Sequence, residues 1–449
     1  MKKQKSMSLA KKMLISLACG LIFGLGCMFL REHLISSGQE STWQTINSIL
    51  FQDITAEGAQ NALGIFYIIG QLFINALQLI IIPMVFTSIT LAICTMRDTK
   101  KLGRISTKTI SCFLLTTTIA LLFAGTMGML VYNSGGFNPL NISDLNVSTG
   151  STGSNPLNIV LEVIPSNIMT AFGNNGRVLS IVFIAVCVGL AINTLGSKVS
   201  VLPKLLEEVN QIITISLTFI INKFAPIAIF VLLTRTFAIY GIDYLMPALT
   251  YVITCVIALF AYLFIAYPIY IRVLAKLNPI PYIKKVAKVA LFGFSTSSSA
   301  ATFPLNKKTT VEELGVHDEI ASFVLPLGMT INMDGTAIMQ VIAAIFVAGT
   351  SGYDVTFASI AIIAILALVS SIGTPAAPGA GAIILFTILT GMGYTNEAAL
   401  LAYSLILAIN RPIEMLVTSL NVVGDSTTSI IVAKSENQFD EETYFKQPQ

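Results

Sequence analysis

Long apolar stretches separated by short polar segments run along the whole chain. Eight of them could cross a lipid bilayer, because a spanning helix needs about 20 predominantly apolar residues. Several are longer than that, which predicts helices that are tilted, broken or extended beyond the membrane. The eight stretches lie at residues 13–30, 62–94, 109–132, 157–194, 203–240, 244–276, 317–349 and 396–433.

Two further apolar stretches, 280–310 and 357–392, are interrupted by small and polar residues. Non-helical backbone at membrane depth is tolerated only where it is buried in protein or lines a watery cavity. We therefore expect two re-entrant helical hairpins, the first from the cytoplasm and the second from outside. Paired interrupted segments of this kind are typical of a transporter's binding site. The predicted fold is an all-α polytopic membrane protein with eight transmembrane helices and two opposed re-entrant hairpins.

Composition agrees with a membrane setting. The 449 residues are 54% hydrophobic and only 11% charged, whereas soluble domains carry about 25% charged residues. The lipid bilayer is therefore the expected partner, and the small net charge of +3 gives no reason to expect a nucleic-acid partner. The six cysteines lie in apolar stretches without CxxC spacing, which disfavours both a disulfide framework and a metal site.

The basic residues predict how the chain is oriented. They gather in segments 97–108, 198–204 and 272–288, whereas segments 134–156 and 350–357 have none. By the positive-inside rule, this distribution predicts eight spans with both termini in the cytoplasm. The first apolar run lacks a clear signal-peptide cleavage site, so we expect an uncleaved first span. The predicted location is the plasma (inner) membrane.

The seventh span has a polar centre at residues 328–336. Its two glycines, Gly328 and Gly335, are expected to let the backbone leave the helix. Freed carbonyls, together with the oxygens of Asn332 and Asp334, would make a cage for a hard cation. Na⁺ suits such a site. The alternative is a kinked helix whose polar groups are capped.

The last span carries Glu414, Thr418, Asn421 and Asp425, spaced by four, three and four residues. This spacing places them on one helix face. Charged groups inside a span are costly and usually mark ligand or ion sites. Arg411 leaves open a structural ion pair with Glu414, but such a pair would not account for Asn421 and Asp425.

The two interrupted stretches have different turn chemistry. Residues 294–304 are rich in serine, and free hydroxyls and amides between two short helices suit a carboxylate. Residues 371–381 are rich in glycine, proline and alanine, which suits a flexible gate. No histidine or lysine lies beside the serines to act as a base, so a hydrolase is disfavoured. An ion channel stays open as a different class; saturable accumulation against a gradient would exclude it.

Four segments in this order, 294–304, 332–336, 371–381 and 421–425, resemble the glutamate transporter family of dicarboxylate/amino acid:cation symporters over almost the whole chain. The resemblance implies a homotrimer of independently working subunits with an elevator mechanism. Scaffold helices would occupy 1–108 and, after an extracellular loop, the rest of 134–243. The transport domain would comprise 109–133 and 244–434. Residues 435–449 would be a cytoplasmic tail, to which we assign no role.

The resemblance also implies more than one Na⁺ site. The implied ligands of the three sites are Gly328, Asn332, Asn421 and Asp425 for the first; Thr330, Met333, Ser371, Ile372 and Thr374 for the second; and Phe113, Thr116, Thr117, Asn332 and Asp334 for the third.

The substrate pocket of the family maps onto nine positions, two of which depart from its pattern. Val417 replaces an arginine that grips acidic side chains, and Glu414 replaces an aspartate that binds the amino group. We therefore expect a small neutral amino acid such as alanine, serine, threonine or cysteine. An acidic amino acid or dicarboxylate, coupled to sodium or protons, is the alternative. The nine positions are Ser299, Met333, Thr336, Ala377, Gly381, Glu414, Val417, Thr418 and Asn421.

Overall fold

The computed structural model describes residues 9–56, 58–94, 100–137, 161, 163–174, 177–241, 245–372, 374 and 379–446. Within them, regular structure is helical apart from one isolated β-bridge. The first half contains α1 (Leu9–Ser36), α2 (Glu40–Leu50), α3 (Ile65–Cys94), α4 (Lys100–Asn133), α6 (Ile168–Phe172), α7 (Val178–Leu195), the 3-10 helix η1 (Gly196–Lys198) and α8 (Val201–Tyr240). The second half contains α9 (Leu245–Ala261), the π-helical η3 (Tyr262–Ala266), α10 (Tyr267–Val273), α11 (Pro279–Thr296), α12 (Ser299–Glu312), α13 (Asp318–Ile331), α14 (Asp334–Thr350), α15 (Phe357–Ile372), α16 (Ala380–Gly391), α17 (Glu397–Ile409), α18 (Arg411–Ser435) and α19 (Glu441–Phe445).

Eight helical stretches of the described chain are long and apolar enough to cross a membrane, which confirms the predicted number. The sixth runs through α9, η3 and α10, and the seventh through α13 and α14. The eight are Lys11–Ser36, Ile65–Leu91, Arg104–Asn133, Ser180–Lys198, Val201–Ile239, Met246–Val273, Asp318–Thr350 and Arg411–Ser435.

Two predicted boundaries were wrong. The fourth span was expected from residue 157, but the spanning helix begins at Ser180, after the separate five-residue α6. The apolar stretch 396–433 is two helices, because α17 ends at Ile409 and α18 begins at Arg411. Pro412 explains this second break. It lies in the first turn of α18, where its missing N–H costs nothing, and it disfavours a continuous helix through the residues before it.

Both interrupted stretches form helical hairpins, as predicted. The first pairs α11 with α12, and the second pairs α15 with α16. The first turn is tight: Ser297 has a φ of 50°, and the hydroxyl of Ser298 caps α12 by accepting from the N–H of Ala301 at 3.3 Å. We call these pairs hairpin 1 and hairpin 2.

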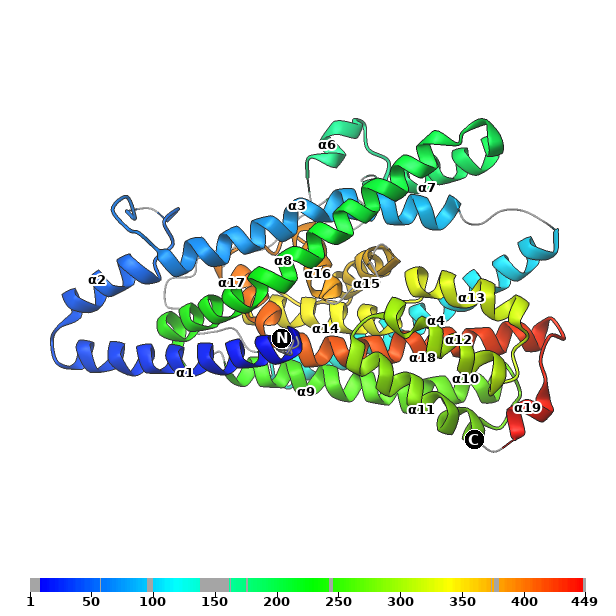
Figure 1. Ribbon diagram of the computed structural model, residues 1–449. Coiled ribbons are helices and arrows are strands. Elements are labelled where there is room, and N and C mark those ends of the chain that lie inside the picture. The colour runs from blue at the N-terminus through cyan, green and yellow to red at the C-terminus, as the bar shows by residue number, and fades with distance from the viewer. Residues whose placement is uncertain are drawn as a thin grey trace, which may run out of the picture.

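The helices pack in two groups. One group consists of α1, α3, α7 and α8, and Figure 1 shows α3 and α8 as long ribbons lying side by side. In the other group, α14 lies at the centre with all its residues buried, in contact with α4, α9, α15, α17 and α18. Hairpin 1 packs along α18 and α13. This arrangement brings the break between α13 and α14 against α18, where the polar residues gather.

Candidate functional site

The polar centre of the seventh span is a short non-helical break. Asn332 and Met333 separate α13 from α14, and their ψ angles of 89° and 45° lie outside the helical range. A helix end leaves backbone groups without intrahelical partners. One of them, the N–H of Gly335, donates to the side-chain oxygen of Asn421 on α18 at 2.8 Å.

The glycines beside the break act differently from the prediction. Gly328 and Gly335 lie inside α13 and α14, so they do not form the break. A Cβ on Gly335 would lie 2.9 Å from the carbonyl oxygen of Val417, and one on Gly328 would collide with the carboxylate of Asp425. These glycines therefore allow α18 to approach closely, and the backbone freedom resides in the Asn332–Met333 step.

Asp334 lies at the start of α14 with a fully buried side chain. Its carboxylate accepts hydrogen bonds from the hydroxyls of Thr117 at 2.6 Å, Thr116 at 3.4 Å and Tyr267 at 3.1 Å. The hydroxyl of Thr116 in turn donates to the carbonyl of Phe113 at 3.0 Å. Thus the structure brings together Phe113, Thr116, Thr117 and Asp334, four of the five residues that the resemblance implied for the third cation site.

Asp425 forms a second buried acidic centre one helix away. Its carboxylate accepts from the amide of Asn332 at 2.9 Å, and the same amide contacts the carbonyl of Asn421 at 3.4 Å. The side-chain oxygen of Asn332 is buried and has no hydrogen-bond partner in the described structure. With Gly328 against Asp425, all four residues predicted for the first cation site lie together.

The two acidic centres contain buried carboxyl groups but no basic side chain among the described residues. Asp334 and Asp425 are at most 1% exposed, and neither belongs to an ion pair among the described residues. A buried carboxylate with only neutral donors is strongly unfavourable unless a cation or proton compensates it. The orphan oxygen of Asn332 and the neighbouring carbonyls offer the hard oxygen ligands that suit Na⁺. The residues therefore fit a bound monovalent cation.

The residues predicted for a second cation site are less closely joined. Thr330 and Ser371 each donate their hydroxyl back to their own helix, at Leu327 and Leu368. Met333 and Thr374 line one common pocket, and Ile372 ends α15. Their assignment as ion ligands stays a prediction.

A small pocket lies between hairpin 1, the break and α18, with a volume of about 30 Å³. By the same measure a water needs roughly 10–15 Å³, so this conformation holds only a couple of waters. Eight of the nine predicted pocket residues line it, and Ala377 lies outside the described residues. The lining consists of Ser297, Ser299, Met333, Thr336, Met339, Thr374, Gly379, Gly381, Glu414, Val417, Thr418 and Asn421.

Three lining residues were missed by sequence reasoning. Met339 lies one turn after Thr336 on α14, and this spacing could have identified it. Ser297 is part of the serine-rich turn that was singled out as a whole. Gly379, with a φ of 87°, begins the described part of hairpin 2 after its turn.

The pocket wall is polar and carries a single charge. Asn421 donates its amide to the hydroxyl of Thr336 at 3.2 Å, and Thr418 donates to the carbonyl of Glu414 at 3.0 Å. Hydroxyls, one amide and the carboxylate of Glu414 supply its polar groups, and no lysine or arginine lines the described wall. A ligand with an ammonium and a carboxylate could therefore place its positive end on Glu414.

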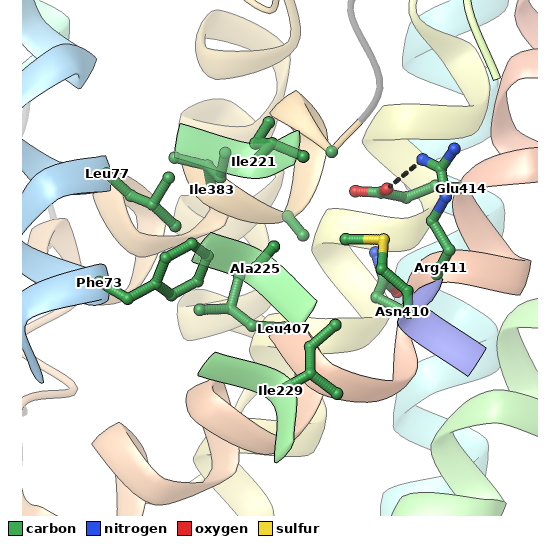
Figure 2. A pocket seen from close by; sticks show the side chains of 13 residues that line it. Phe73, Leu77, Ile221, Ala225, Ile229, Ile383, Leu407, Asn410, Arg411 and Glu414 are labelled. Carbon is green, nitrogen blue, oxygen red and sulfur yellow. Dashed lines mark hydrogen bonds and ion pairs between the residues drawn. The ribbon is translucent and has the colours of Figure 1, made fainter. Parts of the chain in front are cut away.

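Glu414 also lines a second cavity, of about 30 Å³, on the side of α3 and α8. Figure 2 shows apolar side chains of both helices facing Asn410, Arg411 and Glu414. Arg411 contacts Glu414 at 3.5 Å, while Nε of Arg411 and Oε1 of Glu414 have no hydrogen-bond partner in the described structure. This buried pair makes one long contact and leaves a donor and an acceptor unused.

Eight spans, two hairpins and a buried polar site between them are features of a secondary transporter of the symporter class. The chain belongs to the Sodium:dicarboxylate symporter family, whose model matches residues 9–435.

Curated relatives in this family are similar to the chain over most of both lengths. It is 27% identical over 384 residues to a proton/glutamate-aspartate symporter of Escherichia coli K12, covering 83% of this chain and 85% of that protein. It is 29% identical over 381 residues to a proton/sodium-glutamate symport protein of Bacillus caldotenax, with coverages of 83% and 88%. A C4-dicarboxylate transport protein of Bacillus subtilis is 27% identical over 384 residues, with coverages of 83% and 88%. The family and these relatives are transporters, so the chain is a multi-pass membrane symporter and not an enzyme.

Proposed function

We propose that this symporter imports a small neutral amino acid together with Na⁺. The observation that carries the proposal is the charge of the pocket, where Glu414 is the single charged residue of the described wall. The substrate ammonium would pair with Glu414. Its carboxylate would accept hydrogen bonds from the hairpin 1 turn at Ser297 and Ser299 and from the amide of Asn421. A second carboxylate would find no cation in this wall and would be heavily penalised.

Sodium coupling is supported by the two acidic centres beside the pocket. The carboxyl groups of Asp334 and Asp425 are both buried with no cationic partner among the described residues, and Asn332 has an unused side-chain oxygen. Two separate centres favour more than one coupled ion. Asn421 belongs both to the pocket and to the acidic centre at Asp425, since it lines the pocket and its carbonyl contacts Asn332. Cation binding at Asp425 would therefore fix the residue that the substrate contacts.

An acidic amino acid or C4-dicarboxylate is the second candidate, and two observations favour it. The relatives described above are named for glutamate, aspartate and C4-dicarboxylates. Arg411 is buried next to the pocket with its Nε unused. If Arg411 turned toward the pocket, it could supply the cation that position 417 lacks.

The working cycle that we infer uses the two packing groups. The α1, α3, α7 and α8 group would be the scaffold that holds a homotrimer, and the group around α14 and α18 would move as an elevator with both hairpins. Both termini would lie in the cytoplasm. The cavity of Figure 2 is lined mainly by apolar residues from both groups, which suits two groups that slide past one another.

Competition in proteoliposomes tests the substrate assignment. With an inward Na⁺ gradient, unlabelled serine and alanine should compete strongly for uptake of labelled serine, and aspartate and succinate should not. Arg411→Met should leave this order unchanged. Strong aspartate competition that disappears in Arg411→Met would establish the acidic candidate instead. Flux that never accumulates serine above its outside concentration would point to a channel.

A further inference from the structure

The C-terminal segment, to which the sequence assigned no role, folds back against the rest of the chain. After α18 ends at Ser435, the chain turns and forms α19. This short helix lies beside the first turns of α11 (Figure 1). We call residues 436–445 the C-terminal strap. Two backbone hydrogen bonds hold it to the loop between α12 and α13 and form the β-bridge of Val316 with Phe439. The N–H of His317 donates to the carbonyl of Gln438 at 3.2 Å, and the N–H of Asp440 donates to the carbonyl of Gly315 at 2.8 Å.

A buried lysine depends on the strap. Lys285 of α11 is 2% exposed, and its ammonium donates to the carbonyls of Glu313 at 2.8 Å, Thr443 at 3.0 Å and Tyr444 at 2.7 Å. An ammonium has three donors, so all three are used. Two of the three acceptors belong to the strap. Without the strap, the ammonium of Lys285 would lose two of its three acceptors and keep the carbonyl of Glu313.

Tyr444 fixes the strap from its other side. Its ring is fully buried and lies 5.5 Å from the ring of Phe439. Its hydroxyl donates to the carbonyl of Asn278 at 2.8 Å, and Asn278 is the residue that caps the start of α11. Tyr444 thereby ties the strap to the first residues of hairpin 1.

The strap also reaches α4. The carboxylate of Glu436 accepts from Arg104, with Nε at 3.0 Å from Oε2, and pairs with Lys108. The same helix carries Thr116 and Thr117, which hold Asp334. Thus one short segment contacts the beginning of hairpin 1, the loop that follows its second helix, and α4.

The contacts of the strap with hairpin 1 and its adjoining loop lie at the end of the hairpin that is opposite its turn, which we call the base. The turn carries Ser297 and Ser299, which line the pocket. Near the base, the limbs of hairpin 1 are also joined by the ion pair of Lys288 with Glu313. Farther along, α11 is held to α18 by the hydroxyl of Ser419, which donates to the carbonyl of Ala290 at 2.8 Å.

We propose that the C-terminal strap is a lock on hairpin 1, which holds the bases of its two limbs to each other and to α4. Docking of the strap keeps hairpin 1 closed against α18, and release of the strap frees it to move away from the pocket. The link to the pocket rests on the proposed function. The strap's effect on the motion of hairpin 1 does not.

Hydrogen exchange of the purified full chain tests the lock directly. Tyr444→Ala removes a buried ring and the bond to Asn278, so the first turns of α11 and the last turn of α12 should exchange roughly tenfold faster. Tyr444→Phe, which loses only the hydroxyl, should show a smaller increase. Phe445→Ala is the matched control, because its ring is 50% exposed. Equal protection in Tyr444→Ala and Phe445→Ala would overturn the proposal, as would faster exchange that extends to α3 and α8.

A thermal-unfolding cycle tests the role of Lys285. Ending the chain after Ser435 should lower the unfolding temperature more when Lys285 is present than in Lys285→Met, because methionine has no buried charge to lose its partners. Equal losses in both backgrounds would contradict the lock. Neither measurement needs a substrate, so a failure of the proposed amino acid transport would leave both results interpretable.

Discussion

Two regions of buried acidic residues lie beside the same small pocket but differ in their charge partners. At the break between α13 and α14, the donors to Asp334 and Asp425 among the described residues are hydroxyls and an amide. At the start of α18, Glu414 has a built-in cation, because Arg411 lies 3.5 Å away. We infer from this difference that the first region takes its compensating cation or proton from solution, whereas Glu414 in the second could exchange Arg411 for a substrate ammonium.

The largest expected effect comes from removing the charge of the first region. Asp334→Asn keeps the shape of the side chain but cancels the attraction for Na⁺, so sodium affinity should fall by at least about tenfold. Sodium titrations of substrate binding measure this effect. Asp354→Asn, at an exposed aspartate, is the control and should bind sodium normally. An unchanged sodium affinity in Asp334→Asn would remove Asp334 from the cation site.

Removing the charge of the second region should act on the substrate. Glu414→Gln leaves the ammonium of a bound amino acid without a partner and leaves Arg411 uncompensated. Loss of one partner of a buried charge pair costs about 2–5 kcal/mol, or roughly 30-fold or more in affinity. Calorimetric binding of serine measures it, and Glu312→Gln on the surface of α12 serves as the control. A Kd within about threefold of the parent would contradict the role of Glu414.

The selectivity of the second region should change when a cation is added to the pocket wall. Val417→Arg places a guanidinium among the lining residues, where it can bind a second carboxylate in a bidentate manner. In competition assays, we expect the affinity for aspartate relative to that for serine to rise by at least roughly tenfold. Specificity is a difference between two binding free energies, and the added cation favours the ligand with two carboxylates. Val417→Met, similar in length but neutral, should not favour aspartate. The same shift in both variants would indicate a steric cause.

One glycine links the two acidic centres of the first region. A Cβ on Gly424 would collide with the hydroxyl of Tyr267, which holds Asp334, and would lie 2.6 Å from the amide of Asn332, which holds Asp425. Overpacking of this kind costs about 1–3 kcal/mol, so Gly424→Ala should lower both the unfolding temperature and sodium affinity. Gly26→Ala, with open space around it, is the matched control. If the two variants behave alike in sodium titrations, the packing argument fails.

The smallest effect concerns the strap and depends on pH. Arg104 and Lys108 hold the pKa of Glu436 below its usual range. The pKa of Glu436 is therefore lower in the folded protein than in the unfolded chain. Its ion pairs stabilise the folded state at pH values above the ordinary pKa of glutamate, and this stabilisation is lost as the pH falls through the pKa in the folded protein. As pH is lowered below about 4.5, the unfolding temperature of Glu436→Gln should therefore fall less steeply than that of the parent protein. The basic partners Arg104 and Lys108 are exposed to solvent, which screens the ion pairs, so the difference should be within roughly 2 °C. Parallel curves for both proteins would exclude the contribution.

Sequence periodicity was sufficient for the spans and hairpins, because lipid demands long apolar helices and tolerates breaks only at buried sites. The four-three-four spacing on α18 likewise placed Glu414, Thr418, Asn421 and Asp425 on one face. The role of the two glycines could not be read from the sequence, since a glycine that allows close packing looks the same as one that ends a helix. The docked strap was missed because its contacts join residues that are distant in sequence, such as Lys285 and Tyr444.

We propose that cations from solution complete the buried site and drive uptake. Proteoliposomes loaded with a potassium buffer and placed in a sodium or a choline buffer test it through the accumulation of labelled serine. We predict accumulation above the outside concentration with sodium, none with choline, and none with sodium in Asp334→Asn. Equal uptake in sodium and choline buffers would contradict the account.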